Sequence, residues 1–412
     1  MKSTLLAVCG LLFGSAALAE PVSVLFVGNS YTFGRVDPVM SYNAANVRDL
    51  TASMWAANPS GSNAFEPHPW GGVAGIFKQL TVQAGLDYDV ALSTRNAASL
   101  RGHFLNTNAA GWDLRSNLSS QTWNKVVLQE QSDEPLTRRP GLASNPDYFK
   151  NYVDKIEDFL HAGTADSYRE RDFFPGATAA ERTAACVAAT GASATSCNTV
   201  RNIPANAKAS ASTQVYLYQT WARPNLMNGA FLTSTDPVTG AVTRTTTPAT
   251  TFFNSLEAMA SELNLATRDA AALAAADGSG GIAGIAGVGD AFMAAVQAGI
   301  ATRDFWGSEA LSDGLIDLWF DDGTHASKYG SYLSALTLFG SLTGLDPGRF
   351  GVGEIAASDL GIAATDALAL QRIASLQWAQ SQVPEPGSLA LAALALGLLA
   401  IGVRRRGART IP

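Results

Sequence analysis

The length, composition and charge of this chain set the first limits on its function. Its 412 residues are 47% hydrophobic and 15% charged, so the chain can bury a full core and is too apolar to be disordered. The formal net charge of −7 at pH 7 provides no basic field to attract phosphates, and nucleic acid is therefore not expected as a partner.

The N-terminal residues have the order of a secretory signal peptide. Lys2 supplies the positive charge, an apolar run extends from Leu5 to Phe13, and small residues end in Ala17-Leu18-Ala19. We expect cleavage after Ala19, so that residues 1–19 are lost on export and the mature protein begins near Glu20.

Export would leave two cysteines, Cys186 and Cys197, in a compartment where thiols can oxidise. A local disulfide between them is therefore one expectation. Two free thiols are the alternative, because spacing in the sequence does not fix the separation of the two Cα atoms.

Short apolar runs alternate with helical patterns along the chain. The runs that resemble buried strands are residues 22–27, 88–92, 125–128, 214–218 and, less clearly, 281–288. Helical spacing is found at residues 148–161 and 251–276, and a closing helix is expected within 356–382. Strands that alternate with helices imply a parallel sheet covered on both faces, so we expect one doubly wound α/β domain over residues 20–382.

Two segments interrupt this alternation. Residues 163–213 are rich in Ala, Thr, Ser and Asn, and residues 233–250 are rich in Thr. Neither has an apolar periodicity that would bury a face, so both are interpreted as surface insertions. Loops of this kind often shape a substrate site.

The first strand leads directly into Gly28-Asn29-Ser30-Tyr31-Thr32. Ser30 would thus lie at the carboxyl end of a strand, where open α/β sheets bind ligands. Backbone N–H groups at this position could stabilise an oxyanion. Gly, Asn and Ser are also ordinary turn residues, so the motif alone is weak evidence.

The segment Asp321-Asp322-Gly323-Thr324-His325 precedes a good apolar helix near the other end of the chain. A serine hydroxyl needs a base to remove its proton, and an imidazole base needs a carboxylate to fix its tautomer. Asp322 and His325 provide both groups within one turn, although a loop or helix cap is the alternative interpretation. Ser30, Asp322 and His325 are therefore the candidate catalytic residues.

These two segments resemble the first and last conserved blocks of the SGNH (GDSL-like) hydrolases, over roughly residues 22–343. The resemblance implies a flavodoxin-like three-layer α/β/α sandwich with a mostly parallel sheet. It also implies a serine nucleophile at Ser30 and an Asp-x-x-His pair at Asp322 and His325.

The middle blocks of that family, which provide oxyanion donors, are altered in this chain. Ser99 follows the second strand-like run where the family has a Gly, and Gln131 follows the third where the family has an Asn. A backbone donor does not require Gly unless φ is positive, and Gln carries the same amide donor as Asn on a longer side chain. We expect an oxyanion hole of Ser30, Ser99 and Gln131, with Gln129 as the alternative amide.

His68 and His103 are the other histidines near candidate loops, and both are interpreted as structural or peripheral, with His103 the better candidate for the pocket. No spacing of His or Cys residues indicates a metal site, and the Gly-rich residues 278–289 lack the pattern of a phosphate or dinucleotide loop. No cofactor or metal is expected.

The C-terminus carries Val383-Pro384-Glu385-Pro386, an uncharged run over 387–403 and three arginines at 404–406. This order resembles the PEP-CTERM sorting signal, which implies recognition by an exosortase-type machinery in a Gram-negative bacterium. The run is about as short as a membrane-spanning helix can be, and an ordinary membrane anchor is the alternative.

Together these features predict an exported serine esterase that hydrolyses carboxylic esters. O-acyl groups on carbohydrate, acetyl groups above all, are the preferred substrate, because the sorting signal implies a bacterium that makes extracellular polysaccharide. A short-chain lipid ester is the alternative substrate. A non-catalytic carbohydrate-binding or matrix protein on a hydrolase scaffold is the alternative function. The expected location is the periplasm, the outer surface or the extracellular matrix.

Overall fold

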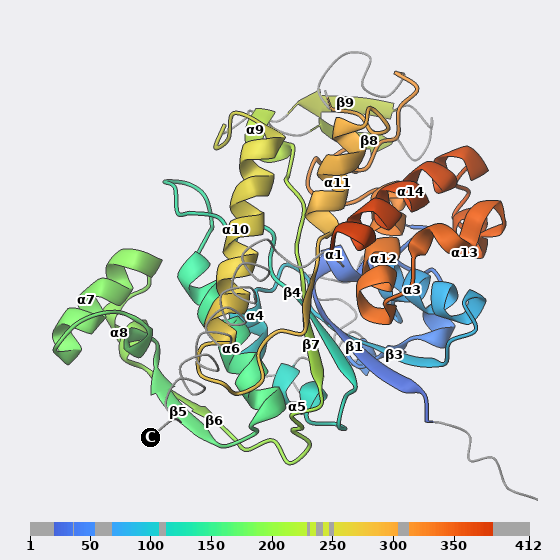
Figure 1. The fold of residues 1–412 in the computed structure, drawn as a ribbon. Coiled ribbons are helices and arrows are strands. Elements are labelled where there is room, and N and C mark those ends of the chain that lie inside the picture. Colours follow the sequence, from blue (N-terminus) through green and yellow to red (C-terminus); the bar gives the residue numbers. More distant parts are fainter. Residues whose placement is uncertain are drawn as a thin grey trace, which may run out of the picture.

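A six-stranded parallel sheet forms the centre of the protein, seen in a computed structural model (Figure 1). The structure describes residues 20–35, 37–53, 68–106, 113–228, 231–235, 242–246, 251–303 and 313–381. The strand order is β10-β7-β4-β1-β3-β2. The strands are β1 (Val22–Gly28), β2 (Arg48–Asp49), β3 (Tyr88–Thr94), β4 (Lys125–Gln129), β7 (Gln214–Tyr218) and β10 (Gly284–Ala286).

Strand β1 lies in the middle of this sheet and is buried on both faces. It pairs in parallel with β3 on one side and with β4 on the other. Val24 and Phe26 belong to one core cluster, whereas Leu25 and Val27 belong to a second cluster across the sheet. Because side chains alternate between the two faces, a strand covered on both sides must be apolar at every position.

Helices cover both faces, which confirms the predicted three-layer α/β/α sandwich. The first face packs against α3 (Gly72–Gln83), α11 (Val288–Gln297), α12 (Lys328–Thr343) and α14 (Ala364–Ser381). The second face packs against α4 (Leu100–Phe104), α5 (Leu114–Leu118), α6 (Pro146–His161) and the C-terminal part of α10 (Leu256–Ala274). Figure 1 shows these two groups of helices on opposite sides of the strands.

The helix boundaries follow from local signals. Helix α6 begins with Pro146, which has no N–H to leave unpaired in the first turn. Helix α12 begins after Ser327, whose hydroxyl accepts hydrogen bonds from the backbone N–H groups of Tyr329 and Gly330. It ends at Gly344, which adopts a left-handed φ of 71°.

The segment 163–213, interpreted above as a surface insertion, contains helices and strands that the sequence analysis did not predict. It contains β5 (Asp166–Arg169), the 3-10 helix η3 (Glu170–Phe173), α7 (Ala179–Thr190), α8 (Ala194–Asn198) and β6 (Val200–Ile203). Strands β5 and β6 pair antiparallel, and the unit projects from the main body in Figure 1. The Ala-rich composition hid a helix whose start is fixed by a capping box of Thr178 and Glu181.

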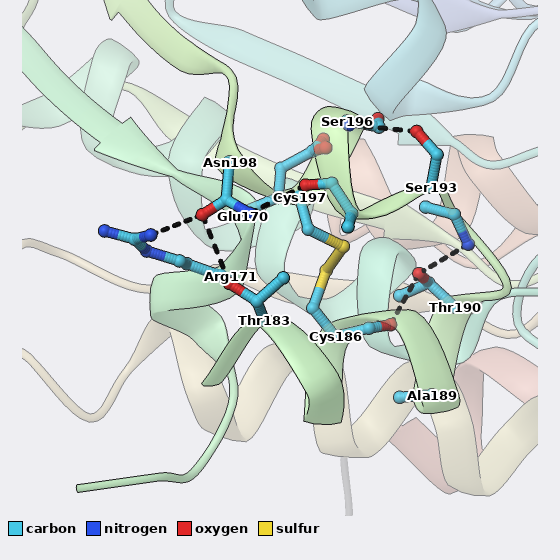
Figure 2. Close-up of a disulfide and its surroundings, with 12 residues drawn as sticks. Glu170, Arg171, Thr183, Cys186, Ala189, Thr190, Ser193, Ser196, Cys197 and Asn198 are labelled. Atoms are coloured by element: carbon cyan, nitrogen blue, oxygen red, sulfur yellow. Dashed lines mark hydrogen bonds between the residues drawn. A yellow bond between two sulfur atoms is a disulfide. The ribbon is translucent and has the colours of Figure 1, made fainter. Parts of the chain in front are cut away.

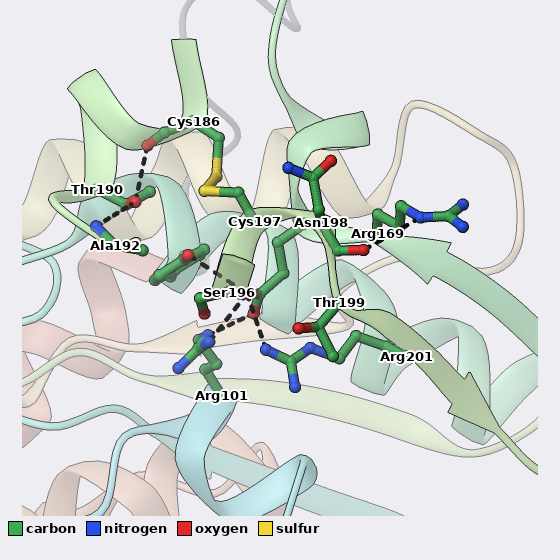
Figure 3. A network of polar contacts seen from close by, with 12 residues as sticks. Arg101, Arg169, Cys186, Thr190, Ala192, Ser196, Cys197, Asn198, Thr199 and Arg201 are labelled. Atoms are coloured by element: carbon green, nitrogen blue, oxygen red, sulfur yellow. Dashed lines mark hydrogen bonds and ion pairs between the residues drawn. A yellow bond between two sulfur atoms is a disulfide. The ribbon is translucent and has the colours of Figure 1, made fainter. Parts of the chain in front are cut away.

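A buried carboxylate ties this insertion to the core. Glu170 accepts hydrogen bonds from Arg101 of α4 at 2.5 Å, from Arg201 of β6 at 3.1 Å and from the Tyr152 hydroxyl of α6 at 2.6 Å. Figure 3 shows Arg101 and Arg201 directed into this network. Burial raises the pKa of Glu170, but the Arg101 guanidinium outweighs it and leaves the pKa below its ordinary value.

A disulfide joins Cys186 of α7 to Cys197 of α8, with Cα atoms 6.2 Å apart (Figure 2). Both cysteines are buried against Phe174. The bond crosslinks two short helices that bury little other apolar surface. The disulfide is therefore expected to contribute much of the local stability.

The Thr-rich segment 233–250 includes part of one strand and all of a second. Strands β8 (Phe231–Thr235) and β9 (Val242–Thr246) pair antiparallel at the top of Figure 1.

No helix within the described ranges is both long and apolar enough to span a membrane. The predicted signal peptide at 1–19 and the predicted C-terminal helix within 383–406 lie outside those ranges.

Replacing both Cys186 and Cys197 with Ser should lower the stability of the insertion by about 2–3 kcal/mol, because the crosslink closes a short loop. Limited proteolysis should cut the double variant within residues 163–213 faster than the wild type. Reductant should produce the same effect in the wild type and none in the variant. Equal cleavage of reduced and oxidised wild type would contradict this account.

Candidate active site

Ser30 begins the short helix α1 (Ser30–Phe33), directly beyond the carboxyl end of β1. The turn that carries it is held by Gln129 at the end of β4. The Gln129 side-chain oxygen accepts hydrogen bonds from the Asn29 backbone N–H and the Thr32 hydroxyl, both at 2.9 Å. Asn29 in turn caps α1 by accepting a hydrogen bond from the Tyr31 N–H.

Gly28 makes this arrangement possible. A Cβ at this position would lie 2.4 Å from the Gln129 side-chain oxygen and 2.4 Å from the Thr32 hydroxyl. Any larger residue would push the glutamine out of reach of the turn. Glycine therefore precedes Ser30 for reasons of space, and its φ is not in the left-handed region.

Asp322 and His325 lie in a tight turn before α12. Gly323 allows this turn with a left-handed φ of 63°. One oxygen of Asp322 accepts the backbone N–H groups of Thr324 at 2.8 Å and His325 at 2.9 Å. The other oxygen is free to meet the imidazole.

The three predicted side chains form one hydrogen-bonded chain. His325 Nε2 lies 2.8 Å from Ser30 Oγ, and His325 Nδ1 lies 2.6 Å from Asp322 Oδ2. With the proton on Nδ1, the imidazole donates to the carboxylate and accepts from the serine hydroxyl. Burial raises the pKa of Asp322, but the hydrogen bond and charge of His325 outweigh it and leave the pKa below its ordinary value.

A stack of aromatic rings contacts the His325 imidazole through Tyr31. The Tyr31 ring stacks on Trp221 at 4.0 Å and meets the His325 ring edge-on at 5.8 Å. The Trp221 indole N–H donates to the Thr324 carbonyl at 3.0 Å, and Phe292 stacks on its other face. Trp221 therefore fixes the position of the turn that carries the histidine.

Arg223 connects the same turn to the loop after β4. Its guanidinium is mostly buried, pairs with Asp133, and donates to Ser132 at 2.8 Å and to Thr324 at 3.4 Å. The sequence analysis missed both Trp221 and Arg223. The available signal was their place in Gln219-Thr220-Trp221-Ala222-Arg223, directly after the strand predicted at residues 214–218.

The structure places Ser99 and Gln131 on loops that hydrogen bonds join to the Ser30 turn. The Asn29 amide donates to the Ala98 carbonyl at 3.1 Å. One oxygen of the buried Glu130 accepts the backbone N–H groups of both Leu100, at 2.9 Å, and Gln131, at 2.6 Å. The Ser99 hydroxyl caps α4 by accepting a hydrogen bond from the Gly102 N–H, and its backbone N–H is the donor that the expected oxyanion hole would use.

The expected oxyanion donors differ in how they are occupied. The Gln131 side-chain oxygen accepts hydrogen bonds from the N–H groups of Asp133 and Glu134, which fixes the orientation of the amide. The NH₂ group of this amide has no acceptor among the described residues. The backbone N–H groups of Ser30 and Ser99 likewise have no acceptor in the part of the chain that the structure describes. The Gln129 amide donates to the Glu130 carbonyl and is already engaged.

Two carboxyl groups are buried beside these loops. Burial, followed by repulsion from Glu134, raises the pKa of Glu130 well above its ordinary value. Burial also raises the pKa of Glu134 to about 7. Both shifts favour the protonated, neutral form, which limits the negative charge near the position where an oxyanion would develop.

Neither of the remaining candidate histidines meets Ser30. His68 Nδ1 lies 2.5 Å from Asp49 Oδ2, and its ring stacks on Trp70. His103 is buried within α4, and burial together with the charge of Arg95 lowers its pKa to about 3. Both positions fit the structural interpretation of these residues.

Comparison with known proteins places a PEP-CTERM protein-sorting motif at residues 382–406, which indicates export across the membrane in Gram-negative bacteria. No curated protein matches the chain.

The comparison with solved structures found several matches, all at low identity. A protein from Slackia heliotrinireducens assigned to the SGNH hydrolases is 17% identical, with 78% of this chain and 100% of that chain covered and a TM-score of 0.34. A DUF4886 family protein from Bacteroides uniformis is 13% identical, with 90% and 99% covered and a TM-score of 0.42. A protein from Parabacteroides merdae assigned as a GDSL-like lipase is 12% identical, with 79% and 97% covered and a TM-score of 0.37. Similarities this distant carry no information on activity.

Replacing Gly28 with Ala should destabilise the protein by about 1–3 kcal/mol, because the added methyl overlaps the Gln129 and Thr32 side chains. Gly353→Ala is the matched control, since a Cβ there meets no atom within 4 Å and φ is not positive. Thermal unfolding of both variants measures the difference. Equal melting temperatures would show that Gln129 does not constrain the turn.

Proposed function

We propose that this protein is an exported serine hydrolase acting on carboxylic esters. The observation that carries the proposal is the hydrogen-bonded chain from Ser30 through His325 to Asp322. A serine is a poor nucleophile unless a base removes its proton, and a base works best when a carboxylate fixes its tautomer. Here His325 is placed as the base for Ser30, and Asp322 is placed to fix the tautomer of His325.

In the proposed reaction, the Ser30 oxygen attacks the ester carbonyl carbon while its proton passes to His325 Nε2. The tetrahedral intermediate collapses, the alcohol leaves with the proton from His325, and an acyl group stays on Ser30. Water then attacks the acyl-enzyme with His325 as base, which releases the acid and restores the serine. Asp322 stabilises the imidazolium in both steps without taking the proton.

The backbone N–H groups of Ser30 and Ser99 and the Gln131 amide are the proposed oxyanion donors. Support for this role is that each lacks a protein acceptor within the described residues. The hydrogen bonds through Asn29 and Glu130 join the three loops that carry them. Donors fixed in this way need little reorganisation when charge develops.

For the substrate we propose an O-acyl ester of a carbohydrate, acetyl esters first, and an exosortase-type machinery as the partner that handles the tail. The sorting motif supports both choices, because it is a signal for export. The final location that we propose is the periplasm, the outer surface or the matrix, among extracellular polysaccharides. A short-chain lipid ester is the second substrate candidate.

A non-catalytic carbohydrate-binding protein is the competing proposal, favoured by the altered oxyanion segments at Ser99 and Gln131. The two proposals differ in whether Ser30 is activated. A fluorophosphonate probe reacts with an activated serine and leaves an ordinary hydroxyl unmodified. Labelling at Ser30 would therefore exclude the non-catalytic alternative.

Ser30→Ala and His325→Ala should each lower kcat for 4-nitrophenyl acetate by about 10⁴-fold or more, since the nucleophile and its base act as a unit. Initial rates on purified protein, extended to longer acyl esters, would also separate an acetyl esterase from a lipase. Ser41→Ala, which removes an exposed hydroxyl that donates to Asp37, is the control and should keep the wild-type rate. Activity that persists in Ser30→Ala would refute the mechanism.

Gln131→Ala should lower kcat by about 10²–10³-fold with little change in KM, because the amide would act on the oxyanion and not on the bound ester. The double variant with Ser30→Ala should show no further loss. A change confined to KM would assign Gln131 to substrate binding and remove it from the oxyanion hole.

A further inference from the structure

A polar groove lies beside the edge strand β10, apart from Ser30. Two neighbouring cavities, of about 490 and 350 Å³, share Asn264, Asp290, Gln377 and Gln380 in their walls, so they form one continuous groove between α10, α11 and α14. None of the residues that line them belongs to the hydrogen-bonded chain of Ser30, His325 and Asp322.

Asp290 organises one wall of this groove. Its two oxygens accept hydrogen bonds from the Gln219 amide at 2.9 Å and from the Asn264 amide at 2.7 Å. The Gln219 side-chain oxygen is left without a partner within the described residues, although Gln219 is only 1% exposed. An unpaired buried acceptor is costly unless a ligand or water meets it.

Gly287 has no side chain, and three polar groups converge beside it. A Cβ on Gly287 would lie 2.9 Å from the Gln377 amide nitrogen, 3.4 Å from the Gln219 oxygen and 3.5 Å from an Asp290 oxygen. One donor and two acceptors therefore face the same small volume. A hydroxyl group can donate and accept at once, which suits this combination better than a purely anionic or cationic group.

We propose that the groove binds a neutral, hydroxyl-rich ligand, namely a saccharide. Its walls combine amides with the indole of Trp378, whose buried N–H has no partner among the described residues. Phosphate is disfavoured, since Arg268 shares the groove with the Asp290 carboxylate. An acyl chain is disfavoured because it would bury these polar groups without pairing them.

The groove reaches the same edge of the sheet as Ser30. Gly287 directly follows β10, Gln219 directly follows β7, and all the strands run parallel. Strand β10 is three positions from β1, which corresponds to about 14 Å at roughly 4.8 Å per strand. A polysaccharide lying along this edge could therefore occupy the groove and present a distant substituent to Ser30; that last step alone rests on the proposed esterase function.

The test uses the full chain with three neutral probes, cellotetraose, maltotetraose and tetra-N-acetylchitotetraose, and with inorganic phosphate for comparison. Titration followed by saturation-transfer NMR should show saturable binding of at least one oligosaccharide and none of phosphate. Gly287→Ala, whose methyl would lie 2.9 Å from the Gln377 amide nitrogen and displace that side chain from the groove wall, should weaken that binding at least tenfold. Gln377→Ala removes the donor from a partly exposed side chain and should also weaken it. Gly353→Ala should bind as the wild type does.

No saturable binding of any oligosaccharide by folded wild type, or binding that both groove variants retain in full, would overturn the proposal. Phosphate binding in place of saccharide binding would overturn it too. Ser30→Ala should bind the oligosaccharide as tightly as the wild type. Loss of esterase activity and loss of saccharide binding are thus separate results, and each proposal can fail without the other.

Discussion

The Gln129 side-chain oxygen provides the contact on which the geometry around Ser30 depends. It accepts from the Asn29 N–H and the Thr32 hydroxyl, and so fixes the turn after β1 from the end of the neighbouring strand β4. The contact requires a glycine at position 28 and a glutamine that is fully buried. Because the amide of Gln129 also donates to the Glu130 carbonyl, its orientation is fixed at both ends. Ser30 is thereby held on a rigid strand end and not on a mobile loop.

The other groups of the candidate site are attached to this turn through buried polar contacts. Glu130 joins the loops after β3 and β4, and Arg223 joins the loop after β4 to the turn of His325. A buried guanidinium or carboxyl group is tolerated only when its hydrogen bonds are satisfied, and one oxygen of Glu130 is not. Such local cost is typical of sites where polar groups are arranged for chemistry before stability.

The sequence was sufficient to predict the fold class and to predict that Ser30, Asp322 and His325 lie close together. The run from Val24 to Val27 in β1 is apolar at four consecutive positions, which indicated a sheet covered on both faces, and parallel strands put their carboxyl ends at one edge. That reasoning placed Ser30 near His325 across 295 positions. It missed Trp221 and Arg223, since their place after the strand predicted at 214–218 indicates only that they lie near the sheet edge, and their contacts with Thr324 are encoded by no local pattern. It also missed the helices of residues 163–213, where a disulfide replaces the apolar periodicity of a larger core.

The Gly-rich residues 278–289 show how a pattern without a chemical motif can still carry structural information. The strand-like run expected at 281–288 contains β10 only over Gly284–Ala286, and Gly289 lies in α11, where a Cβ would lie 2.2 Å from the Thr220 carbonyl oxygen. Beside Gly287, two residues earlier, a donor and two acceptors converge instead. Gly289 brings α11 against the segment that follows β7, and this contact positions Asp290 to accept the hydrogen bond from the Gln219 amide. Gly287, which has no side chain, lets the Gln219 oxygen, the Gln377 amide and Asp290 approach one another beside the groove, so the packing at one glycine supports the arrangement of polar groups at the other.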